Sequence, residues 1–340
     1  PGKLCFGCGG VLFGVLVWLT VVWAVYGFRF AISPMGDASH TTVLLERVLQ
    51  SQSSFFMVIN ELRQAGWVPD AYGRAFLESL LYTGEGRSSY LLGSAGQGAW
   101  YYFPFALLIK LPLSLWLLLL VALLPLLSQR TWRQHPWNFA ICAGVPIFYL
   151  LVLCTADLQI GVRHALPLLP MMFFWLAWGL AQGQVFWRRK SVLALALLAV
   201  LEFGWAYPDF LQYFSPIVGG ASQGHYYLVD SNLDWGQDLK ALKSWMDEEG
   251  VEHINLSYFG TAKPEYYGIS ATHLRGQSSV FTPAGKIGER PKLPGWIAIS
   301  VTNLKQELPG FYSGMREKEP DAKIKETIWL DYWDPAKDQN

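Results

Sequence analysis

The distribution of charged residues is the feature that most constrains this chain. Five long stretches contain no Asp, Glu, Lys or Arg: residues 4–28, 88–109, 111–129, 136–156 and 165–187. A helix needs roughly 20 mostly apolar residues to cross the hydrocarbon core of a bilayer. A charge at mid-bilayer costs on the order of 3 kcal/mol or more, so charge-free runs of this length are typical of membrane-spanning helices. The spacing therefore predicts a polytopic α-helical membrane protein.

We expect five spans, over residues 8–27, 101–127, 137–155, 165–183 and 191–207. The short links between them are basic, and the basic residues are Lys3, Arg130, Arg133, Arg188, Arg189 and Lys190. Short basic links remain in the cytoplasm. This rule predicts that the N-terminus is inside and that residues 28–100, 156–164 and 208–340 are outside.

Composition divides the chain into two expected domains. The hydrophobic runs lie almost entirely within residues 1–207, which we expect to form a transmembrane domain with a large outer loop at 28–100. Residues 208–340 carry mixed charges and are expected to form an extracytoplasmic domain. The formal net charge of +0 gives no argument for a nucleic-acid partner.

The outer loop and the outer domain both contain recognisable local patterns. Residues 41–63 and 69–82 have apolar positions at helical spacing, and these helices could lie on the membrane surface or pack on the outer domain. In the outer domain, the stripe Leu239, Leu242 and Met246 predicts a helix that stops at Gly250. Strand-like runs are residues 225–229, 251–258, 296–301 and 327–333. This order favours a small α/β domain.

The four cysteines are Cys5, Cys8, Cys142 and Cys154, and all lie in hydrophobic segments. The spacing of Cys5 and Cys8 is that of a metal or redox pair, but no second pair or nearby His completes such a site. We interpret these residues as small buried hydrophobes and expect no metal centre.

Ionisable residues beside the spans are the first candidate site, since such residues are expensive there unless they are used. They are Lys110, Asp157, Arg163, His164 and Glu202, all expected near the outer surface. Three potential cations at one depth suit an anionic ligand such as a lipid phosphate, bound by Arg163, His164 and Lys110. The alternative is that Lys110 extends to the interface and that Arg163 pairs with Asp157 or Glu202.

The second candidate site is the segment Asp230-Ser-Asn-Leu-Asp-Trp-Gly-Gln-Asp238, which precedes the expected helix. Its carboxylates and amides, on Asp230, Asn232, Asp234, Gln237 and Asp238, could hold a divalent cation or sugar hydroxyls at the end of a strand. Judged from spacing alone, helix capping by Asn232 or Asp234, with Asp238 in the first turn, is the better interpretation.

Several common catalytic motifs are absent from the sequence. It contains no phosphate-binding loop of the Walker type, no nucleophile elbow and no His-Glu-x-x-His pair. The sequence therefore does not predict a nucleotide-dependent enzyme, a serine hydrolase of that type or a zinc peptidase.

Taken together, several segments resemble bacterial membrane glycosyltransferases related to protein O-mannosyltransferases, of the GT-C superfamily and family 39 type. The resemblance is carried by Gly161-Val-Arg-His-Ala-Leu-Pro-Leu-Leu-Pro170, Tyr90-Leu-Leu-Gly-Ser, Gly98-Ala-Trp-Tyr-Tyr-Phe-Pro104, Lys110-Leu-Pro112, Tyr213-Phe-Ser-Pro-Ile-Val-Gly-Gly220, Tyr258-Phe-Gly260 and the segment 230–239. It covers residues 20–300, and Asp234-Trp-Gly-Gln-Asp238 is its most specific part. The resemblance sets a role for this segment in an acceptor or donor crevice beside capping as an equal alternative, because neither Trp235 nor Gln237 has a capping function. Glu202 is a further candidate for that crevice.

The resemblance implies a transferase in the bacterial inner membrane that takes a sugar from a polyprenyl-phosphate carrier on the outer face. The acceptor would be a protein, a lipid or a glycan. A carboxylate base would act on the acceptor, and cations would stabilise the leaving lipid phosphate. Lys110 and Arg163 are the candidates for the second role.

One part of the family pattern has no counterpart. The family's catalytic acid lies in its first outer loop, and no residue of this chain matches it, so the catalytic residue is not assigned. The chain begins with Pro1 rather than Met, and we expect it to be the C-terminal part of a longer enzyme. Two other functions stay open: a transporter of lipid-linked sugar, and a membrane-anchored accessory protein whose outer domain binds glycan.

Overall fold

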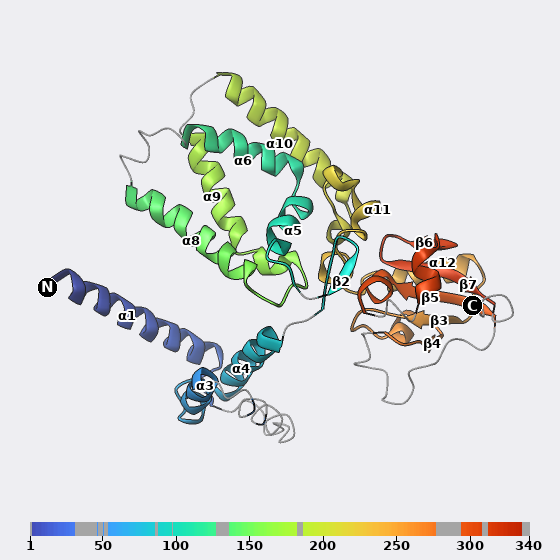
Figure 1. Ribbon diagram of the computed structural model, residues 1–340, viewed down its shortest axis with the longest axis horizontal. Coiled ribbons are helices and arrows are strands. Elements are labelled where there is room, and N and C mark those ends of the chain that lie inside the picture. Colours follow the sequence, from blue (N-terminus) through green and yellow to red (C-terminus); the bar gives the residue numbers. More distant parts are fainter. Residues whose placement is uncertain are drawn as a thin grey trace. The chain divides into compact units, whose positions relative to one another are not determined.

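The computed structural model describes residues 2–30, 46, 50, 54–85, 88–96, 98–126, 136–181, 186–276, 294–307 and 312–334. The chain packs into two compact units, Pro1–Gly86 and Arg87–Asn340 (Figure 1). The boundary expected at 207/208 separates a membrane part from an outer part, and it stays a prediction. It lies within the second unit.

The described residues of the first unit include the helices α1 (Gly2–Val25), α3 (Ser54–Gln64) and α4 (Asp70–Glu85). Helices α3 and α4 pack on each other around Leu77, which contacts Phe56 and Ile59. Asp70, in the first turn of α4, pairs with Arg63 and also with Arg74 at 2.7 Å. The helices expected over 41–63 and 69–82 are thus confirmed where the structure describes them, whereas most of 41–53 lies outside the described residues. Their placement on a membrane stays a prediction.

The second unit begins with a helical half. Its members are α5 (Tyr102–Lys110), α6 (Leu113–Leu126), α8 (Pro136–Cys154), α9 (Leu168–Ala181) and α10 (Phe186–Ala206). Helix α6 packs against α9 and α10, and α8 packs against α5 and α9 (Figure 1). A short hairpin, β1 (Ser89–Leu91) with β2 (Ser94–Gly96), precedes α5.

The expectation of one continuous helix over 101–127 is wrong. The helix is interrupted at Leu111 and Pro112, and the direction bends by 105° between α5 and the apolar part of α6. Proline has no amide proton and disfavours helical torsions in the residue before it, and Leu111 is extended, with φ −92° and ψ 148°. Among the described residues, the length and apolarity needed to cross a bilayer are met by α5 and α6 taken together and by no helix alone.

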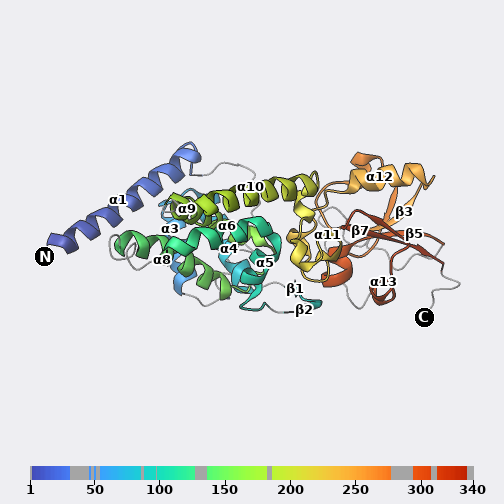
Figure 2. The same cartoon turned by 90° about the horizontal axis from the view of Figure 1, so that it is seen from above.

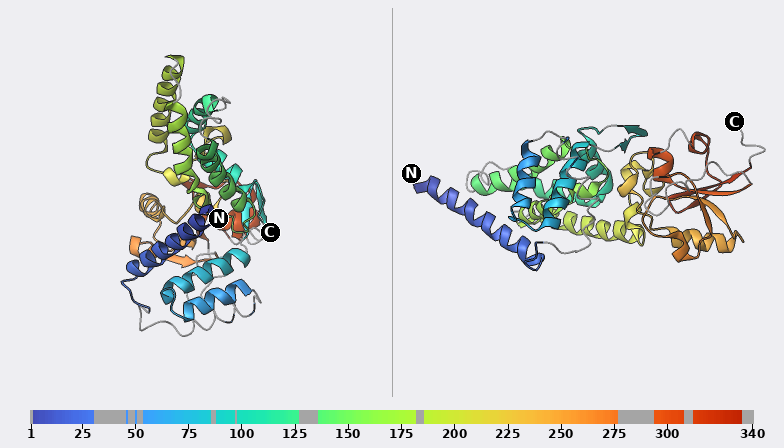
Figure 3. Two further views of the ribbon diagram at one scale, coloured as in Figure 1. Left: turned by 90° about the vertical axis from the view of Figure 1, so that its left-hand side faces the viewer. Right: turned by 90° about the horizontal axis from the view of Figure 1, so that it is seen from below.

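The sheet half contains five strands in the order β4-β3-β5-β7-β6. Strands β3 (Ile254–Ser257), β4 (Ala271–His273) and β5 (Gly295–Ser300) are parallel, while β7 (Ile328–Trp333) is antiparallel to both β5 and β6 (Ala322–Ile324). These strands, orange to red, lie side by side in Figure 3. The short helices of this half are α11 (Ala221–Gly224), α12 (Leu239–Glu248) and α13 (Ser313–Glu317).

Most of the local expectations for this half are confirmed. Helix α12 buries Leu239, Leu242 and Met246, and strands lie within 251–258, 296–301 and 327–333, their ends shifted by a few residues. The strand expected over 225–229 is wrong. This segment follows α11 as a turn, because the amides of Tyr227 and Leu228 both bond to the Gly224 carbonyl.

The sheet has a core on each face. Helix α12 covers one face, packing with Ile254, Leu256 and Leu330 (Figure 2). On the other face, Ile299 and Trp329 join a buried cluster that extends through the 228–233 segment to α5, α8 and α9. The two halves of the second unit therefore share one hydrophobic core, which fixes the loops at their junction.

Candidate functional site

Two loops meet where the helical and sheet halves join. The first leads into the 3-10 turn Val162–Ala165 before α9, and the second contains the 3-10 turn Asp230–Asn232. The Asn232 Oδ1 atom accepts the Val162 amide proton at 2.8 Å, and the Ser231 hydroxyl donates to the Ile160 carbonyl. These bonds hold the two predicted sites together, although they lie about 70 residues apart in the chain.

The close approach of the two loops requires glycine at position 161. A Cβ atom on Gly161 would lie 2.1 Å from the Ser231 hydroxyl oxygen, far inside contact distance. Any side chain would therefore push the loops apart. In the sequence, Gly161 stands out only as part of a motif, and the role of Ser231 cannot be predicted, since neither residue signals a distant partner.

The Lys110 side chain stabilises the backbone at this junction by hydrogen bonds. Its ammonium donates to the carbonyls of Leu211, Tyr213 and Asn232 at 2.8, 2.5 and 2.7 Å. An ammonium has three protons, so all of them are used in this geometry. Lys110 thus neither extends to a membrane interface nor presents a proton to a lipid phosphate here; it fixes the backbone at Asn232.

Asn232 is the centre of the junction. Its side-chain amide donates to the Tyr102 hydroxyl at 2.9 Å and to the Val229 carbonyl at 3.2 Å. Asp230 precedes it with φ +57°, and the Asp230 Oδ1 atom accepts the Ser231 amide at 2.5 Å. Both side chains are buried and shape the loop.

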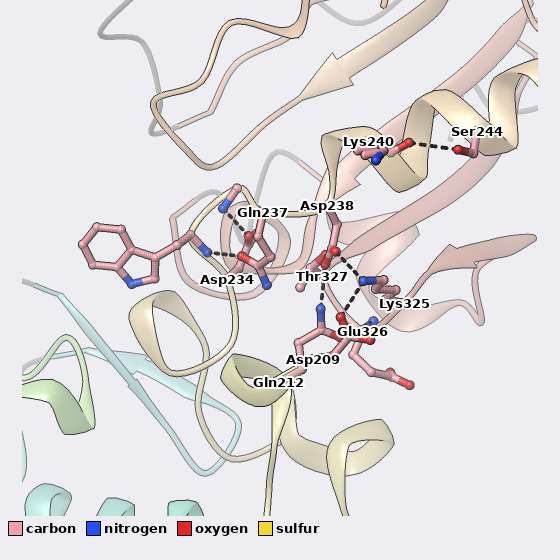
Figure 4. A network of polar contacts seen from close by, with 12 residues as sticks. Asp209, Gln212, Asp234, Gln237, Asp238, Lys240, Ser244, Lys325, Glu326 and Thr327 are labelled. Carbon is pink, nitrogen blue, oxygen red and sulfur yellow. Dashed lines mark hydrogen bonds and ion pairs between the residues drawn. The ribbon is translucent and has the colours of Figure 1, made fainter. Parts of the chain in front are cut away.

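The segment after Asn232 is a turn that presents Trp235. Asp234 Oδ1 accepts the Gly236 amide at 2.7 Å, and Gln237 Oε1 accepts the Trp235 amide at 2.7 Å. Gly236 has φ +74°, and a Cβ atom there would lie 1.9 Å from the Tyr258 hydroxyl. Figure 4 shows Asp234 and Gln237 side by side in this turn. The Asp-Trp-Gly-Gln order is therefore explained by the turn.

The turn brings Trp235 to Arg163. The Trp235 side chain is 54% exposed, and the Arg163 guanidinium lies over its ring, 4.8 Å from the centroid. The Arg163 Nε–H also donates to His164 Nε2 at 3.5 Å. Among the residues that the structure describes, no carboxylate lies within ion-pair distance of Arg163. This arrangement, called here the Arg163–Trp235 pair, is an exposed cation over the face of an aromatic ring.

His164 is suited to accept the bond from Arg163. Burial lowers its pKa, and the Arg163 charge lowers the pKa further. The imidazole is consequently neutral at pH 7, with a nitrogen available as an acceptor. Its carbonyl is fixed by the Tyr149 hydroxyl at 2.7 Å.

Asp234, which precedes Trp235 in the turn, has an unusually high pKa. Burial raises its pKa to about 8, and the nearby Asp238 and Asp230 charges add to this, against the Gly236 amide and the Ser300 hydroxyl, which lower it. A buried carboxyl of this kind cannot contact a substrate directly. Its role here is to position the turn that carries Trp235.

Asp238 does not act as predicted. Helix α12 begins at Leu239, so capping by Asn232 or Asp234 is wrong, and Asp238 at the N-cap position makes no side-chain capping bond. Its carboxylate instead accepts Gln212 Nε2 at 2.6 Å and the Thr327 hydroxyl at 2.7 Å (Figure 4). It also pairs with Lys325 at 3.1 Å.

Glu202 lies in a separate environment. Its carboxylate accepts the amides of Leu113 and Ser114 at 3.0 and 3.1 Å and the Ser114 hydroxyl, at the start of α6. A carboxylate at a helix N-terminus satisfies orphan amides and favours the helix dipole. The alternative pairing of Arg163 with Glu202 or Asp157 is not found among the described residues, and Asp157 is exposed.

An apolar groove of about 510 Å³ lies among α5, α6, α8 and α9. Its wall is built from aliphatic and aromatic side chains, including Leu107, Leu150 and Leu168. Leu168 is the first residue of α9, three residues after the end of the 3-10 turn that contains Arg163. The groove lining thus includes a residue that follows the Arg163 turn closely in the chain.

Within the described ranges, no group of three His, Cys, Asp or Glu side chains is arranged to hold a metal ion. Comparison of the chain with models of protein families, with curated proteins and with solved structures finds no match. The chemistry of the site is accordingly the basis for any functional assignment.

Proposed function

We propose that this protein is a membrane glycosyltransferase that uses a polyprenyl-phosphate-linked sugar as donor. The observation that carries the proposal is the Arg163–Trp235 pair, in a chain that also has an apolar groove whose lining includes Leu168, five residues after Arg163. A polyprenyl phosphate has a long apolar chain and an anionic head, and this arrangement offers a surface for each. The resemblance of the motifs around Arg163 and Asp234 to family 39 enzymes supports the same function.

The reaction would break the bond between the sugar's anomeric carbon and the phosphate oxygen. A hydroxyl of the acceptor would form the new bond to that carbon, its proton would pass to a base, and the electron pair of the broken bond would remain on the phosphate. Negative charge thus grows on the lipid phosphate as the bond breaks. A fixed guanidinium stabilises such charge most when it is already oriented before reaction.

Each element of the site has a role in this proposal. Arg163 would bind the phosphate, and its planar guanidinium can donate two hydrogen bonds to phosphate oxygens while its face rests on Trp235. His164, neutral and bonded to Arg163 Nε, would hold the guanidinium in place. Asn232, Lys110 and Asp234 would position the two loops and would not touch the donor. The base is not assigned to a residue of this chain.

The charge-free runs and the short basic links of the sequence support the proposed membrane arrangement. The helical half would lie in the bacterial inner membrane, with the sheet half outside the cytoplasm, so transfer would occur on the outer face. The acceptor would be a protein, a lipid or a glycan with an accessible hydroxyl.

The test is sugar transfer by the full-length protein that contains this chain, in proteoliposomes supplied with a radiolabelled polyprenyl-phosphate sugar and a membrane extract as acceptor. Arg163→Ala should lower the transfer rate by about 100-fold, because a charge-assisted contact made mainly in the transition state is worth about 3 kcal/mol. Arg163→Lys should lower it less, since a lysine keeps the charge but loses the planar, bidentate geometry.

Arg189→Ala is the matched control, because Arg189 is an exposed arginine on α10. It should transfer at the wild-type rate. An Arg163→Ala protein with full activity would contradict the proposal. A wild-type chain that binds glycan without transferring sugar would favour the accessory role instead.

A further inference from the structure

A second cavity, of about 660 Å³, lies at the end of α10. It is bounded by the end of α10, by the segment from Tyr207 to Ser222 and by the turn between β6 and β7. The residues that matter for its chemistry are Trp205, Tyr207, Asp209, Gln212, Lys325 and Glu326. None of them contributes to the Arg163–Trp235 pair.

Aromatic side chains form one wall of this cavity. Trp205 is 81% exposed, and Tyr207 is also largely exposed. Tyr207 packs edge-to-face on Phe210, with ring centroids 6.0 Å apart, and Phe210 stacks on Phe203 at 4.7 Å. The Tyr207 ring is thus held in place before any ligand arrives, which lowers the entropy lost on binding.

The polar groups of the cavity are mainly acceptors. Among the described residues that line it, Glu202, Asp209 and Glu326 are acidic and Lys325 is basic. Lys325 bonds to Asp209 at 2.5 Å and to Asp238 at 3.1 Å (Figure 4). Partial burial lowers the pKa of Lys325, but these two carboxylates more than offset this and raise it. The only cation lining the described cavity is therefore already neutralised, so an anionic ligand is disfavoured.

The turn that carries Lys325 and Glu326 has an uncommon backbone conformation. Lys325 has φ +50°, a left-handed value that costs a residue with a side chain on the order of 1 kcal/mol. The Glu326 amide is held by Gln212 Oε1 at 3.2 Å. Burial raises the pKa of Glu326. The conformation places Lys325 against two carboxylates and leaves Glu326 on the cavity wall.

We propose that this cavity binds an uncharged sugar. Sugar rings combine apolar C–H faces, which suit the exposed faces of Trp205 and Tyr207, with hydroxyls, which suit acceptors such as the carboxylate of Glu326. The cavity is large enough for a ligand of one or two rings. The inference does not depend on the proposed transferase activity.

The test is saturation-transfer NMR on the full chain in detergent micelles, with glucose, galactose, mannose, N-acetylglucosamine and their disaccharides as probes. At least one of these sugars should bind saturably. Trp205→Ala should weaken its binding about 10-fold, because the largest apolar contact is lost. Glu326→Gln should weaken it by a smaller factor, since an amide retains one acceptor oxygen.

Trp137→Ala is the matched control, since Trp137 is 79% exposed on α8 and does not line the cavity. It should bind sugar as the wild type does. Equal weakening by Trp205→Ala and Trp137→Ala would show that Trp205 only anchors the protein in its detergent or membrane, and would overturn the proposal. So would saturable binding by none of the sugars, or displacement of the sugar by inorganic phosphate. Sugar binding without sugar transfer would remove the proposed function and leave this inference intact.

Discussion

The two polar regions of the second unit use positive charge in opposite ways. At the Arg163–Trp235 pair, an exposed guanidinium rests on a ring with a neutral imidazole beside it and no described carboxylate within ion-pair distance. At the cavity of about 660 Å³ beside the end of α10, called here the α10 cavity, Lys325 is bonded to Asp209 and Asp238. A cation without a carboxylate partner can bind an anionic ligand, whereas the charge of a cation with two carboxylate partners is already neutralised. The difference explains why we assign a phosphate to the first region and an uncharged sugar to the second.

The segment 230–238 connects these regions. Its first part, through Asn232 and Trp235, builds the Arg163 region, and its last residue, Asp238, holds Lys325. Lys110 shows a third use of a cation, in which backbone carbonyls take all three protons. Substituting Arg163, Lys325 and Lys110 one at a time therefore distinguishes a cation that stabilises the fold from one that binds a ligand.

The largest loss of stability is expected from Lys110→Met. The substitution keeps the length of the side chain but leaves three backbone carbonyls without their donor, and each costs about 1–3 kcal/mol when buried. We expect the free energy of unfolding to fall by about 4 kcal/mol, measured by urea unfolding in mild detergent. Lys240→Met, at an exposed site on α12, should change it by less than about 0.5 kcal/mol.

An unchanged stability for Lys110→Met, with loss of polyprenyl-phosphate binding, would contradict this account. Such a result would indicate that Lys110 binds the lipid phosphate, as the sequence predicts.

A smaller loss is expected from Lys325→Met. Asp238 is only 3% exposed and would keep its charge without its cation. Because the Lys325 side chain is 36% exposed, we expect about 2 kcal/mol rather than the 3–5 kcal/mol typical of fully buried pairs. Adding Asp238→Asn should restore part of this loss in a double-mutant cycle. Additive effects of the two substitutions would show that the pair is not coupled.

The smallest effect per pH unit is the pH dependence that comes from Asp234. Its pKa is about 8 in the folded protein, against an ordinary value of 3.8. Between these values the folded state holds a proton that the unfolded state has released, so the free energy of unfolding falls as pH rises. The slope from this group is at most about 1.4 kcal/mol per pH unit, and it vanishes below pH ~4 and above pH ~8.

Asp234→Asn should remove this slope, as measured by unfolding at several pH values between 4 and 8. Asp247→Asn, at an exposed carboxylate on α12, should retain it. If the Asp234→Asn protein keeps the wild-type slope, then Asp234 is ionised in the fold and does not support the Trp235 turn as a neutral acid.

Local elements of the fold could be predicted from the sequence, because their signals are local. The stripe at Leu239, Leu242 and Met246 and the stop at Gly250 define α12 without knowledge of the rest of the chain. The bend at Pro112 was missed because an apolar, uncharged run indicates length and not direction. The run 225–229 predicts a strand because its apolar residues are typical of a buried strand. These residues are buried, but the segment is irregular.

Most of the site could be predicted only as a set of residues. The sequence singles out Arg163 and Trp235 separately, but the contact between residues 72 positions apart depends on the junction of the two halves. The roles of Glu202 and Asp238 depend on equally distant partners, at the start of α6 and on the β6–β7 turn. Residues of the α10 cavity such as Asp209 and Lys325 carry no local motif and were not anticipated.

The central claim is that Arg163 receives the phosphate of a lipid carrier. Its most direct test is equilibrium binding of a polyprenyl phosphate and of the uncharged polyprenol of equal length to the full chain in detergent. The wild type should prefer the phosphate at least 10-fold, a difference of about 1.4 kcal/mol, and Arg163→Ala should bind both alike. A wild type without that preference, or an Arg163→Ala protein that retains it, would contradict the assignment.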